Sequence, residues 1–581
     1  MRVVATAGHV DHGKSTLVRA LTGMQPDRWA EERRRGMTID LGYAWTTLAS
    51  GTELAFVDVP GHQRFIANML AGLGPAPSVL FVVAADEGWS RQSDEHLAAI
   101  DALRVTHGVL AVTRSDLADP APALADAAAR LARTSLGTVA GVAVSGATGA
   151  GVDELRLALD LMTLRMPEPE VAGPVRLWVD RAFTVRGSGT VVTGTLGSGA
   201  VGVGDQLELR GRSVTVRSVQ SLGRAHERVA AAARVALNLR GVGRDEVARG
   251  DVLLTPQTWH DTTEVDARLA PPSDLPAALM LHIGTAALPV RVRSLGGGVV
   301  RVRLPRPLPL RAGDRAVLRD PGRRTVAAGL LVLDADPPPL RRRGAAAARA
   351  AELAAATGAL DATVEVARRG AMRRAHLHGL GGVPPAGVQE VGDWLVAPDR
   401  WQRWVAAVEP AVQAWAVRNP LDPAVPVPAL AYALGLPDDA LAAPVAVASG
   451  LDVSGGRVHP AAVPASLGAA EEAVRTLEVR LGAQPFAAPE ADELSRLGLG
   501  HRELSAAERT GRLLRLDGDV VLLPSAPDLA VSRLGVLPQP FTTSQARQAF
   551  RTTRRVAVPL LEHLDRLGRT ERVDGVLRRL R

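Results

Sequence analysis

The sequence predicts a multidomain protein built from three successive kinds of structure: an α/β domain, antiparallel β domains and small helical units. Residues 1–168 alternate apolar strand-like runs with helical stretches, the pattern of a parallel sheet covered by helices on both faces. Residues 172–335 hold short β-branched runs separated by Gly and Asp turns, which is typical of antiparallel barrels. Residues 340–581 are rich in alanine and repeat a helical stretch with a short closing hairpin at a spacing of roughly 55–65 residues.

Composition narrows the class of protein further. The 581 residues include no cysteine, which excludes disulfides, thiolate metal sites and cysteine catalysis. No apolar run of about 18 residues occurs and no signal segment precedes the first expected strand, so we expect a cytoplasmic, monomeric protein without membrane contact. The formal net charge is +7, and a basic protein of this kind points first to nucleic acid as a partner.

A phosphate-binding loop is predicted between a strand at 2–7 and a helix at 16–21. The loop comprises Gly8, His9, Val10, Asp11, His12, Gly13, Lys14, Ser15 and Thr16. Gly8 and Gly13 allow the backbone N–H groups to converge on phosphate oxygens. Lys14 can reach the terminal phosphates, and the Ser15 hydroxyl can hold Mg²⁺. The alternative is a glycine-rich turn with a chance Lys-Ser pair; against it, Lys14 is the only lysine in the chain, and a compact ammonium fits between phosphates where a planar guanidinium does not.

Further motifs follow the expected strands at 53–58, 78–84, 108–113 and 140–144, at the sheet edge where open α/β sheets bind ligands. Asp58 can orient Mg²⁺ through water, and Gly61 offers a backbone N–H to a γ-phosphate. His62 lies next to the expected position of an attacking water. Upstream, Thr38 provides a hydroxyl that can close over Mg²⁺ when a γ-phosphate is present.

The last two strands are followed by residues suited to reading a guanine base. Asp116, in the segment Thr113-Arg114-Ser115-Asp116, can accept two hydrogen bonds from the N1–H and N2–H₂ groups of guanine, which adenine lacks. Backbone N–H groups of Ser145, Gly146 and Ala147 can contact the guanine O6. Each motif is weak alone, but their order and spacing in one α/β domain make a chance match improbable.

Five motifs together, GHVDHGKST, RGMTI, DVPGH, TRSD and SGA, resemble those of translational GTPases of the elongation factor Tu class. The resemblance implies a P-loop GTPase domain that binds GTP, GDP and Mg²⁺, with the metal at Ser15, Thr38 and Asp58 and with Gly61 and His62 in the second switch. It places Val10 and Met37 as an apolar gate beside the catalytic His62. The Lys usually found before the guanine-reading Asp is replaced by Arg114; because Arg also stacks on a base, we expect guanine specificity to survive.

Two further stretches, residues 36–43 and 64–72, resemble the selenocysteine-specific elongation factors rather than the general factor. In that family the cleft between the GTPase domain and the second domain holds the aminoacyl end of the tRNA. Asp180 and Arg181 match the positions implied to recognise the selenocysteyl group, and a cationic partner suits an ionised selenol. The alternative is a surface pair that closes a barrel strand. Arg240 and His226 are weaker candidates, because the family's pocket His is displaced or absent here.

The expected domains are a GTP-binding domain at 1–168, β barrels at 172–257 and 261–335, and four winged-helix units at 340–408, 409–463, 467–526 and 527–581. Helices followed by a turn-centred hairpin are typical of the winged helix, a helix-turn-helix variant. The closing hairpins are expected near 391–396, 454–459, 517–524 and 573–577.

The last unit is predicted to bind RNA. Residues 541–581 contain ten Arg against four acidic residues, a net charge of +6. Arg547, Arg551, Arg554 and Arg555 gather at the start of the second helix of the unit, where helix-turn-helix domains meet nucleic acid. The alternative is a solvated helix face, the usual fate of a charge run. Arg suits an RNA hairpin through phosphate contacts and base stacking, and the family implies an mRNA selenocysteine-insertion hairpin.

We therefore interpret the chain as a GTP-driven factor that delivers selenocysteyl-tRNA to a ribosome at UGA codons while it holds the mRNA hairpin. Two alternatives stay open from the sequence. The first is a general elongation-factor-like GTPase that delivers ordinary aminoacyl-tRNA. The second is a nucleic-acid-binding regulator that uses GTP as a ligand without catalysis.

Overall fold

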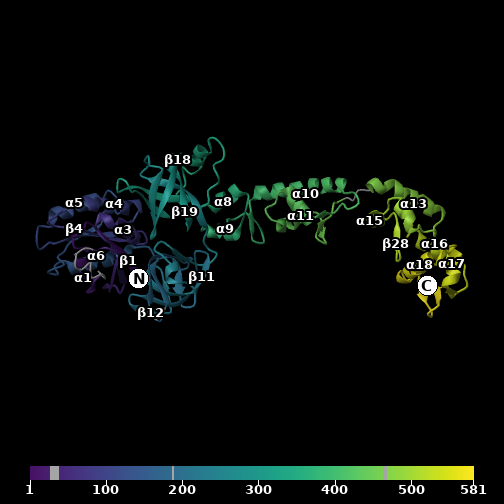
Figure 1. Ribbon diagram of the computed structural model, residues 1–581, viewed down its shortest axis with the longest axis horizontal. Coiled ribbons are helices and arrows are strands. Elements are labelled where there is room, and N and C mark those ends of the chain that lie inside the picture. Colours follow the sequence, from purple (N-terminus) through teal and green to yellow (C-terminus); the bar gives the residue numbers. More distant parts are fainter. Residues whose placement is uncertain (27–37, 186, 188, 462–466) are drawn as a thin grey trace. The chain divides into compact units, whose positions relative to one another are not determined.

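The structure is a computed structural model of the whole chain and describes all residues except 27–37, 186, 188 and 462–466 (Figure 1). The chain forms two compact units, Met1–Ala386 and Gly387–Arg581. The first unit holds the α/β domain and both barrels, and the second holds most of the helical repeats.

The α/β domain is built on a six-stranded sheet in the order β2-β3-β1-β4-β5-β6, in which only the β2–β3 pair is antiparallel. Its strands are β1 Arg2–Ala7, β2 Gly42–Thr47, β3 Glu53–Asp58, β4 Val79–Ala84, β5 Gly108–Thr113 and β6 Ala140–Ala143. Its helices are α1 Lys14–Thr22, η1 Gln63–Phe65, α3 Ile66–Leu73, α4 Arg91–Ala102, α5 Ala121–Leu131 and α6 Val152–Arg165. The all-apolar strand VLFVVA of β4 is fully buried, because helices cover both faces of a parallel sheet.

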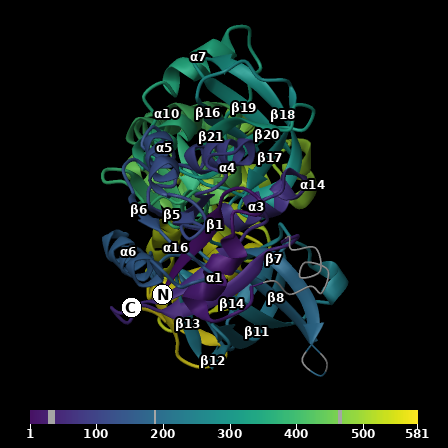
Figure 2. The same ribbon diagram turned by 90° about the vertical axis from the view of Figure 1, so that its left-hand side faces the viewer.

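The helices divide between the two faces of this sheet. Buried side chains of α1 and α6 pack in one core, and those of α3, α4 and α5 pack in another. Figure 2 shows α1 and α6 on one side of the strands and α3, α4 and α5 on the other. The carboxyl ends of β1, β3, β4 and β5 therefore share one edge, where the loops that follow them meet.

Two antiparallel β domains follow. The first comprises β7 Arg176–Val185, β8 Gly189–Leu196, β9 Ala200–Gly202, β10 Gln206–Leu209, β11 Arg212–Ser221, β12 Arg224–His226, β13 Arg228–Ala230, β14 Ala233–Arg240, η2 Arg244–Glu246 and β15 Val252–Leu254. Its main sheet has the order β10-β15-β7-β8-β14-β11-β12, and the first strand of this order, β10, also pairs with β11. The second is a closed barrel in the order β16-β19-β18-β17-β20-β21. Its strands are β16 Asp261–Ala270, β17 Ala278–Ile283, β18 Ala286–Gly296, β19 Val299–Pro309, β20 Arg315–Asp320 and β21 Thr325–Asp334.

The first unit ends in a short helical segment beside the second barrel. It contains α7 Ala345–Glu352, α8 Ala362–Arg369, β22 Ala371–Arg373 and α9 Arg374–Gly379. Ala350 and Leu353 pack against Leu295, Val299 and Leu333 of the barrel. The division between the compact units, after Ala386, thus falls within the range 340–408 expected for the first winged-helix unit.

The second unit consists of helices that alternate with short hairpins. Its helices are α10 Pro398–Arg418, α11 Val427–Leu434, η3 Asp439–Leu441, α12 Ala442–Ala448, η4 Gly468–Ala470, α13 Glu471–Ala483, α14 Ala491–Arg496, α15 His501–Arg509, α16 Ala526–Leu534, α17 Thr543–Phe550 and α18 Arg554–Arg566. Its strands are β23 Gln389–Val391, β24 Trp394–Val396, β25 Val425–Pro426, β26 Val453–Ser454, β27 Arg457–Val458, β28 Leu514–Leu516, β29 Val520–Leu522, β30 Phe541–Thr542, β31 Thr570–Arg572 and β32 Leu577–Leu580. Three-stranded sheets of the orders β25-β27-β26 and β30-β32-β31 close two of the repeats in the winged-helix manner.

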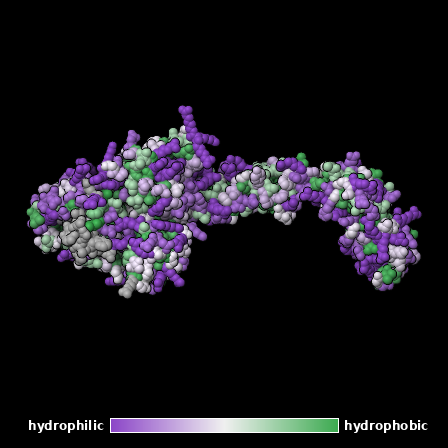
Figure 3. All heavy atoms as spheres, viewed as in Figure 1, coloured by the Kyte–Doolittle hydropathy of each residue, from purple (hydrophilic) through white to green (hydrophobic). Residues whose placement is uncertain are grey.

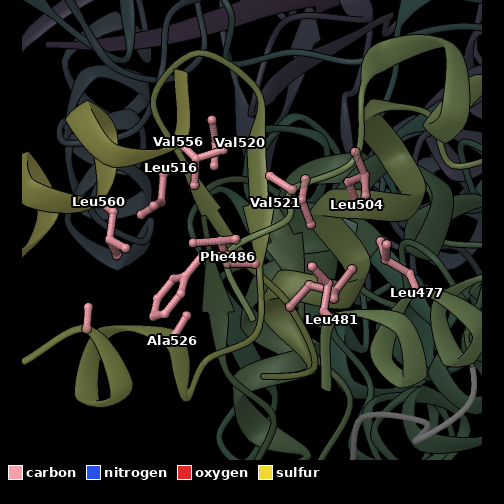
Figure 4. Close-up of a cluster of buried hydrophobic side chains, with 14 of the residues drawn as sticks. Leu477, Leu481, Phe486, Leu504, Leu516, Val520, Val521, Ala526, Val556 and Leu560 are labelled. Atoms are coloured by element: carbon pink, nitrogen blue, oxygen red, sulfur yellow. The ribbon is translucent and has the colours of Figure 1, made fainter. Parts of the chain in front are cut away.

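One hydrophobic core extends from Leu467 to Leu564 and so joins the last two repeats. Figure 4 shows side chains of α13, α15, the β28–β29 hairpin and α18 gathered around Phe486. The Phe486 and Phe550 rings stack with their centroids 4.9 Å apart. The aromatic stack carries this core across the boundary between the repeats.

Among the described residues, no single helix is both long and apolar enough to cross a membrane. Helices Val427–Leu434 and Asp439–Ala448 pass a length and composition test together, but they are bent by 100° at the break between them. On the face that Figure 3 shows, hydrophilic side chains predominate and hydrophobic areas are small.

Candidate functional site

The loop between β1 and α1 has the backbone that phosphate binding requires. Gly8 has a φ of +128°, and a Cβ atom there would lie 2.1 Å from the carbonyl oxygen of Val82. Gly13, with a φ of +79°, is the N-cap of α1. A larger side chain at Gly8 would clash with the backbone of β4 and displace the loop. Glycine at this position therefore allows the N–H groups of the loop to converge at the N-terminus of α1.

Lys14 lies buried beneath this loop. Its ammonium group donates to the carbonyl oxygens of Gly8 (3.0 Å) and His9 (2.6 Å). Burial lowers the pKa of Lys14 to about 8, although the carboxylates of Asp58 and Asp11 oppose the shift. A Cβ atom on Gly61 would lie 2.5 Å from the Lys14 ammonium nitrogen, so the loop after β3 closes directly onto the lysine. These contacts fit a site that holds a terminal phosphate between Lys14 and the backbone of Gly61.

Three oxygen ligands for a hard cation lie together beside Lys14. The Ser15 hydroxyl donates to Asp58 Oδ2 (2.6 Å) and lies 2.9 Å from the Thr38 hydroxyl oxygen. Asp58 is fully buried, and its Oδ1 accepts a hydrogen bond from the Thr6 hydroxyl (2.7 Å). Hydroxyl and carboxylate oxygens are the ligands that Mg²⁺ prefers, so the residues fit the ion that the sequence implied.

His62 lies one residue beyond Gly61 and is half-buried. Its Nδ1 accepts a hydrogen bond from the backbone N–H of Arg64 (3.1 Å), so a neutral imidazole carries its proton on Nε2. Its ring centroid lies 6.1 Å from that of Phe65. Val10, one expected gate residue, is partly exposed, whereas Met37, the other, lies outside the described residues together with Arg35 and Gly36.

The residues expected to read the base are joined to the phosphate loop. The Thr113 hydroxyl donates to the His12 carbonyl oxygen (2.7 Å). Arg114 pairs with Asp86 (2.8 Å) and Glu87 (2.7 Å), and it also donates to the Asp11 carbonyl oxygen. Arg114 thus holds the base loop, the end of β4 and the phosphate loop together.

The remaining base-reading residues lie on two loops. Asp116 is exposed, while Ser145 is buried and accepts a hydrogen bond from the Thr148 N–H (3.1 Å) through its hydroxyl oxygen. Gly146 lies against the start of α1, since a Cβ atom there would be 3.2 Å from Thr16 Cγ2, and Ala147 is exposed beside it. The base and phosphate residues therefore share one edge of the sheet.

Helix α4 supplies two supports that sequence reasoning missed. The Gly8 N–H donates to His96 Nδ1 (3.1 Å), and the Val10 N–H donates to Gln92 Oε1 (3.1 Å). Burial, reinforced by Lys14 and His9, lowers the pKa of His96 to about 3 and keeps the ring neutral as an acceptor. Gln92 and His96 lie more than 80 positions along the sequence from the loop residues that they contact. The only sequence signal for their shared role is that they are four residues apart, which places them on one face of a helix.

The residues expected to hold the aminoacyl group divide between two structural roles. Asp180 is buried, accepts a hydrogen bond from the Thr193 hydroxyl (2.6 Å) and pairs with Arg234. Arg181 instead donates to the Leu41 carbonyl oxygen (3.0 Å) and pairs with Asp40 (3.3 Å), so it links the first barrel to the α/β domain.

Arg234 lies beside Arg181, whereas Arg240 lies further along the same barrel. The guanidinium groups of Arg234 and Arg181 lie 4.1 Å and 5.4 Å from the centroid of the Tyr43 ring, beside a cleft of about 160 Å³ between the domains. Arg181 is in register with Thr193, and Thr193 with Ala236. Arg240 lies four residues beyond Ala236 on β14, which corresponds to about 13 Å at the usual rise per residue of a strand. His226 sits on β12, where its Nε2 lies 3.3 Å from the Ser221 carbonyl oxygen.

The arginines expected to bind RNA are not equally available. Arg551, the αL residue between α17 and α18, and Arg554, the first residue of α18, are exposed, while Arg547 is partly buried. Arg555 donates to the carbonyl oxygen of Pro489 (2.9 Å) and pairs with Glu490 (3.2 Å).

Six other arginines of the last winged-helix unit pair with acidic residues. The pairs are Arg566–Asp517, Arg569–Asp528, Arg572–Glu562, Arg578–Asp565, Arg579–Glu571 and Arg581–Glu571. Among the described residues of this unit, the arginines outside such pairs are Arg533, whose guanidinium lies over the Phe486 ring, Arg547 on α17, and Arg551 and Arg554 beside the start of α18.

Comparison with known proteins supports each part of this architecture. Family models match residues 1–165 (Elongation factor Tu GTP binding domain) and 189–254 (Elongation factor Tu domain 2). Two others match residues 262–339 (Selenocysteine-specific elongation factor, beta-barrel domain) and 535–579 (Elongation factor SelB, winged helix). The expected combination of an α/β P-loop domain, β barrels and a C-terminal winged helix is confirmed.

Relatives extend this likeness. The chain is 41% identical over 348 residues to the selenocysteine-specific elongation factor of Escherichia coli (strain K12), a match that covers 58% of this chain and 56% of that protein. It is 31% identical to elongation factor Tu 2 of Streptomyces avermitilis, with 57% of this chain and 96% of that protein covered. The crystal structure of a bacterial selenocysteine-specific elongation factor superposes over the whole of both chains with a TM-score of 0.82 at 25% identity. The matched part spans little more than half the length of the selenocysteine-specific relatives.

Proposed function

Since the chain belongs to the elongation factor Tu family of translational GTPases, and within it to the selenocysteine-specific factors, we propose that it binds and hydrolyses GTP to deliver selenocysteyl-tRNA to the ribosome. The observation that carries the GTPase part is that Lys14, Ser15, Thr38 and Asp58 lie together at one glycine-containing loop. A turn with a chance Lys-Ser pair has no reason to bring together residues from three separate segments.

In this proposal the chain's own residues bind and orient the nucleotide. Lys14 neutralises the terminal phosphates, and the N–H groups of the loop and of Gly61 donate to their oxygens. Ser15, Thr38 and Asp58 would hold Mg²⁺, which when bound supplies positive charge to the phosphate oxygens. Asp116 accepts the two guanine N–H groups, and Arg114 holds its loop against Asp11.

Hydrolysis is assigned to the loop after β3. His62 adjoins Gly61, whose backbone closes onto Lys14, so its imidazole lies next to the proposed site of the terminal phosphate. We propose that ribosome contact reorients His62 toward the attacking water and so triggers hydrolysis. Thr38 is proposed to report the nucleotide state, because its hydroxyl lies beside that of Ser15 and its segment leads directly to Asp40.

The aminoacyl end of the tRNA is proposed to bind between the α/β domain and the first barrel. Arg181 and Arg234 flank Tyr43 there, and two guanidinium groups suit an ionised selenol better than a neutral hydroxyl. Asp180 is assigned a positioning role, since its carboxylate is already shared by Thr193 and Arg234.

The start of α18 is proposed to hold an mRNA hairpin. Arg551 and Arg554 are the exposed candidates for phosphate and base contacts, with Arg547 beside them. A factor that holds both the tRNA and the mRNA concentrates the loaded tRNA at the correct codon, so the combined specificity can exceed that of either contact alone. Because the proposed partner is the ribosome, we propose that the protein acts in the cytoplasm, and we propose that it does so as a monomer.

Hydrolysis is tested with His62→Ala and with His107→Ala as the matched control, because His107 is likewise a half-buried histidine of the same domain. We expect His62→Ala to lose ribosome-stimulated GTP hydrolysis by at least about a hundredfold with nucleotide affinity unchanged. The control should behave as the wild type. Undiminished hydrolysis by His62→Ala would favour a regulator that uses GTP only as a ligand.

The selenocysteine part has a separate test: filter binding of selenocysteyl-tRNA against seryl-tRNA on the same tRNA body. We expect a preference for selenocysteyl-tRNA that Arg181→Gln and Arg234→Gln reduce. Equal affinities for the two would point to a general factor and would leave the GTPase part standing.

A further inference from the structure

A second cluster of ligand-type side chains lies in the first unit, on elements that the proposed function does not use. His260, Asp336 and His376 each offer one ligand atom, and these three atoms lie within 4.8 Å of one another. His260 ends the linker between the two barrels, Asp336 follows β21, and His376 lies on α9. Two imidazoles and a carboxylate from three separate segments therefore converge at one place.

The distances in this cluster are close to those of a metal site. The Nε2 atoms of His376 and His260 lie 2.9 Å and 3.9 Å from the same Asp336 oxygen, Oδ2. The ring centroids of the two histidines are 4.7 Å apart. A tetrahedral ion with ligands at about 2.0–2.1 Å sets neighbouring ligand atoms about 3.3 Å apart. The observed separations lie on either side of that value, so small side-chain rotations would close the site around an ion.

The backbone around the cluster is held by its own hydrogen bonds. The His260 N–H donates to the carbonyl oxygen of Gly379, the last residue of α9 (3.2 Å). Arg311 donates to the carbonyl oxygens of Thr258 (2.6 Å) and His378 (3.2 Å), and its guanidinium lies 3.7 Å from the centroid of the Trp259 ring. The linker and α9 are thus fixed relative to each other, and the two histidines are pre-positioned.

Two guanidinium groups lie beside the cluster and pair with nearby carboxylates. Arg369 pairs with Asp336 Oδ2 (2.8 Å) and with Glu365 (2.6 Å), while Arg368 pairs with Glu365 (2.7 Å) and Asp334 (3.3 Å). The two cations are therefore shared among three carboxylates. Carboxylates that bind metal ions in proteins are themselves hydrogen-bonded, and Arg369 supplies such a bond to Asp336 Oδ2.

We propose that His260, Asp336 and His376 bind one divalent transition-metal ion, with Zn²⁺ as the best match to two imidazoles and a carboxylate. Mg²⁺ and Ca²⁺, which prefer all-oxygen sites, are not expected to compete. The ion ties α9 to the linker between the barrels. Three protein ligands leave the fourth tetrahedral position to a water molecule, and we assign the ion no part in GTP hydrolysis.

The proposal is tested with the full, tag-free chain, stripped of metal and nucleotide and titrated with Co²⁺, a spectroscopic substitute for Zn²⁺. We expect one equivalent of Co²⁺ to bind with visible absorption and to raise the thermal midpoint of unfolding. His260→Gln and His376→Gln should each weaken binding by at least about tenfold. His378→Gln, which changes an exposed histidine two residues along α9, should bind as the wild type does.

Two further measurements keep the test decisive. Fluorescent GDP binding by each variant shows that the variant is folded. A GDP titration of the cobalt-loaded wild type distinguishes the site from His9, His12 and Glu87, a second group of this kind in the described part of the chain, which lies around the phosphate loop. A spectrum that GDP leaves unchanged supports the proposal. Absence of binding, equal loss in His378→Gln and His376→Gln, or a spectrum that responds to GDP would overturn it.

Discussion

Arg114 determines how firmly the base loop is held to the phosphate loop. Its guanidinium pairs with Asp86 and Glu87 and donates to the Asp11 carbonyl oxygen. We expect Arg114→Ala to weaken GDP and GTP binding by about tenfold. This factor corresponds to a loss of about 1.4 kcal/mol, which is a reasonable value for charge-assisted hydrogen bonds in a partly exposed site. Arg114→Lys should retain most of the affinity, because an ammonium can still reach the Asp11 carbonyl oxygen.

Titration with fluorescent GDP checks this prediction. Arg130→Ala is the matched control, since it removes an exposed ion pair with Asp126 on α5 of the same domain. A twofold or smaller loss in Arg114→Ala would show that the loops are held by Thr113 and the backbone alone.

His282, buried in the second barrel, makes stability depend on pH. Burial, with a contribution from Arg319, lowers its pKa from 6.5 to about 4. Between those values the unfolded chain binds more protons than the folded one, so this contribution to stability is constant above pH 6.5 and is lost as the pH falls toward 4. From pH 7.5 to pH 5 the loss is about 2 kcal/mol for this group.

The substitution His282→Gln removes this titration. Urea unfolding midpoints at pH 7.5 and pH 5, followed by circular dichroism, should fall less with acidification in the variant than in the wild type. The comparison isolates His282, because the other buried histidines are common to both proteins. Identical shifts in the two proteins would show that the barrel does not keep this ring neutral.

At the scale of elements, the last two repeats share one hydrophobic core, so we expect them to unfold together. Phe486 is 3% exposed, stacks on Phe550 and lies under the guanidinium of Arg533. We expect Phe486→Ala to destabilise the C-terminal helices by about 3–5 kcal/mol through the cavity it leaves. Because the core is continuous, hydrogen exchange should show loss of protection in α13 and α18 together.

Val479→Ala is the control for this prediction, since Val479 lies on α13 but is 72% exposed. It should leave exchange nearly unchanged. Protection lost in α13 alone would mean that the two repeats fold separately despite the aromatic stack between them.

Local patterns in the sequence predicted the elements better than their partnerships. The motif GHVDHGKST predicted the phosphate loop, and the apolar runs of β4 and β5 between helical stretches predicted the sheet. Both are local signals, because each is read from residues that are close together in the sequence. The ion pair between Arg234 and Asp180 joins two different strands of the first barrel. The register of those strands cannot be predicted from the sequence of either one. The core around Phe486 was missed for the same reason, since the repeat pattern marks hairpins but not which helices pack together.

At the scale of the whole molecule, the proposed nucleotide site and the proposed RNA site lie in different compact units. Lys14 and its partners belong to Met1–Ala386, whereas Arg551 and Arg554 belong to Gly387–Arg581, and the units have separate cores. Units of this kind are expected to act independently unless a shared two-state element links them. We therefore predict that GTP, GDP and the nucleotide-free state give the same hairpin affinity within about twofold, below the roughly fivefold that coupling typically produces.

Two reciprocal variants check this independence in the full chain. Lys14→Ala should abolish nucleotide binding and leave hairpin affinity intact. The double variant Arg551→Gln and Arg554→Gln should weaken hairpin binding and reduce its dependence on salt by about one to two phosphate contacts, with GDP affinity unchanged. Arg579→Gln with Arg581→Gln removes the same charge from residues paired with Glu571 and should have a smaller effect. A hairpin affinity that changes fivefold or more with the bound nucleotide would contradict independence, and linkage would then require the hairpin to shift GTP affinity by the same factor.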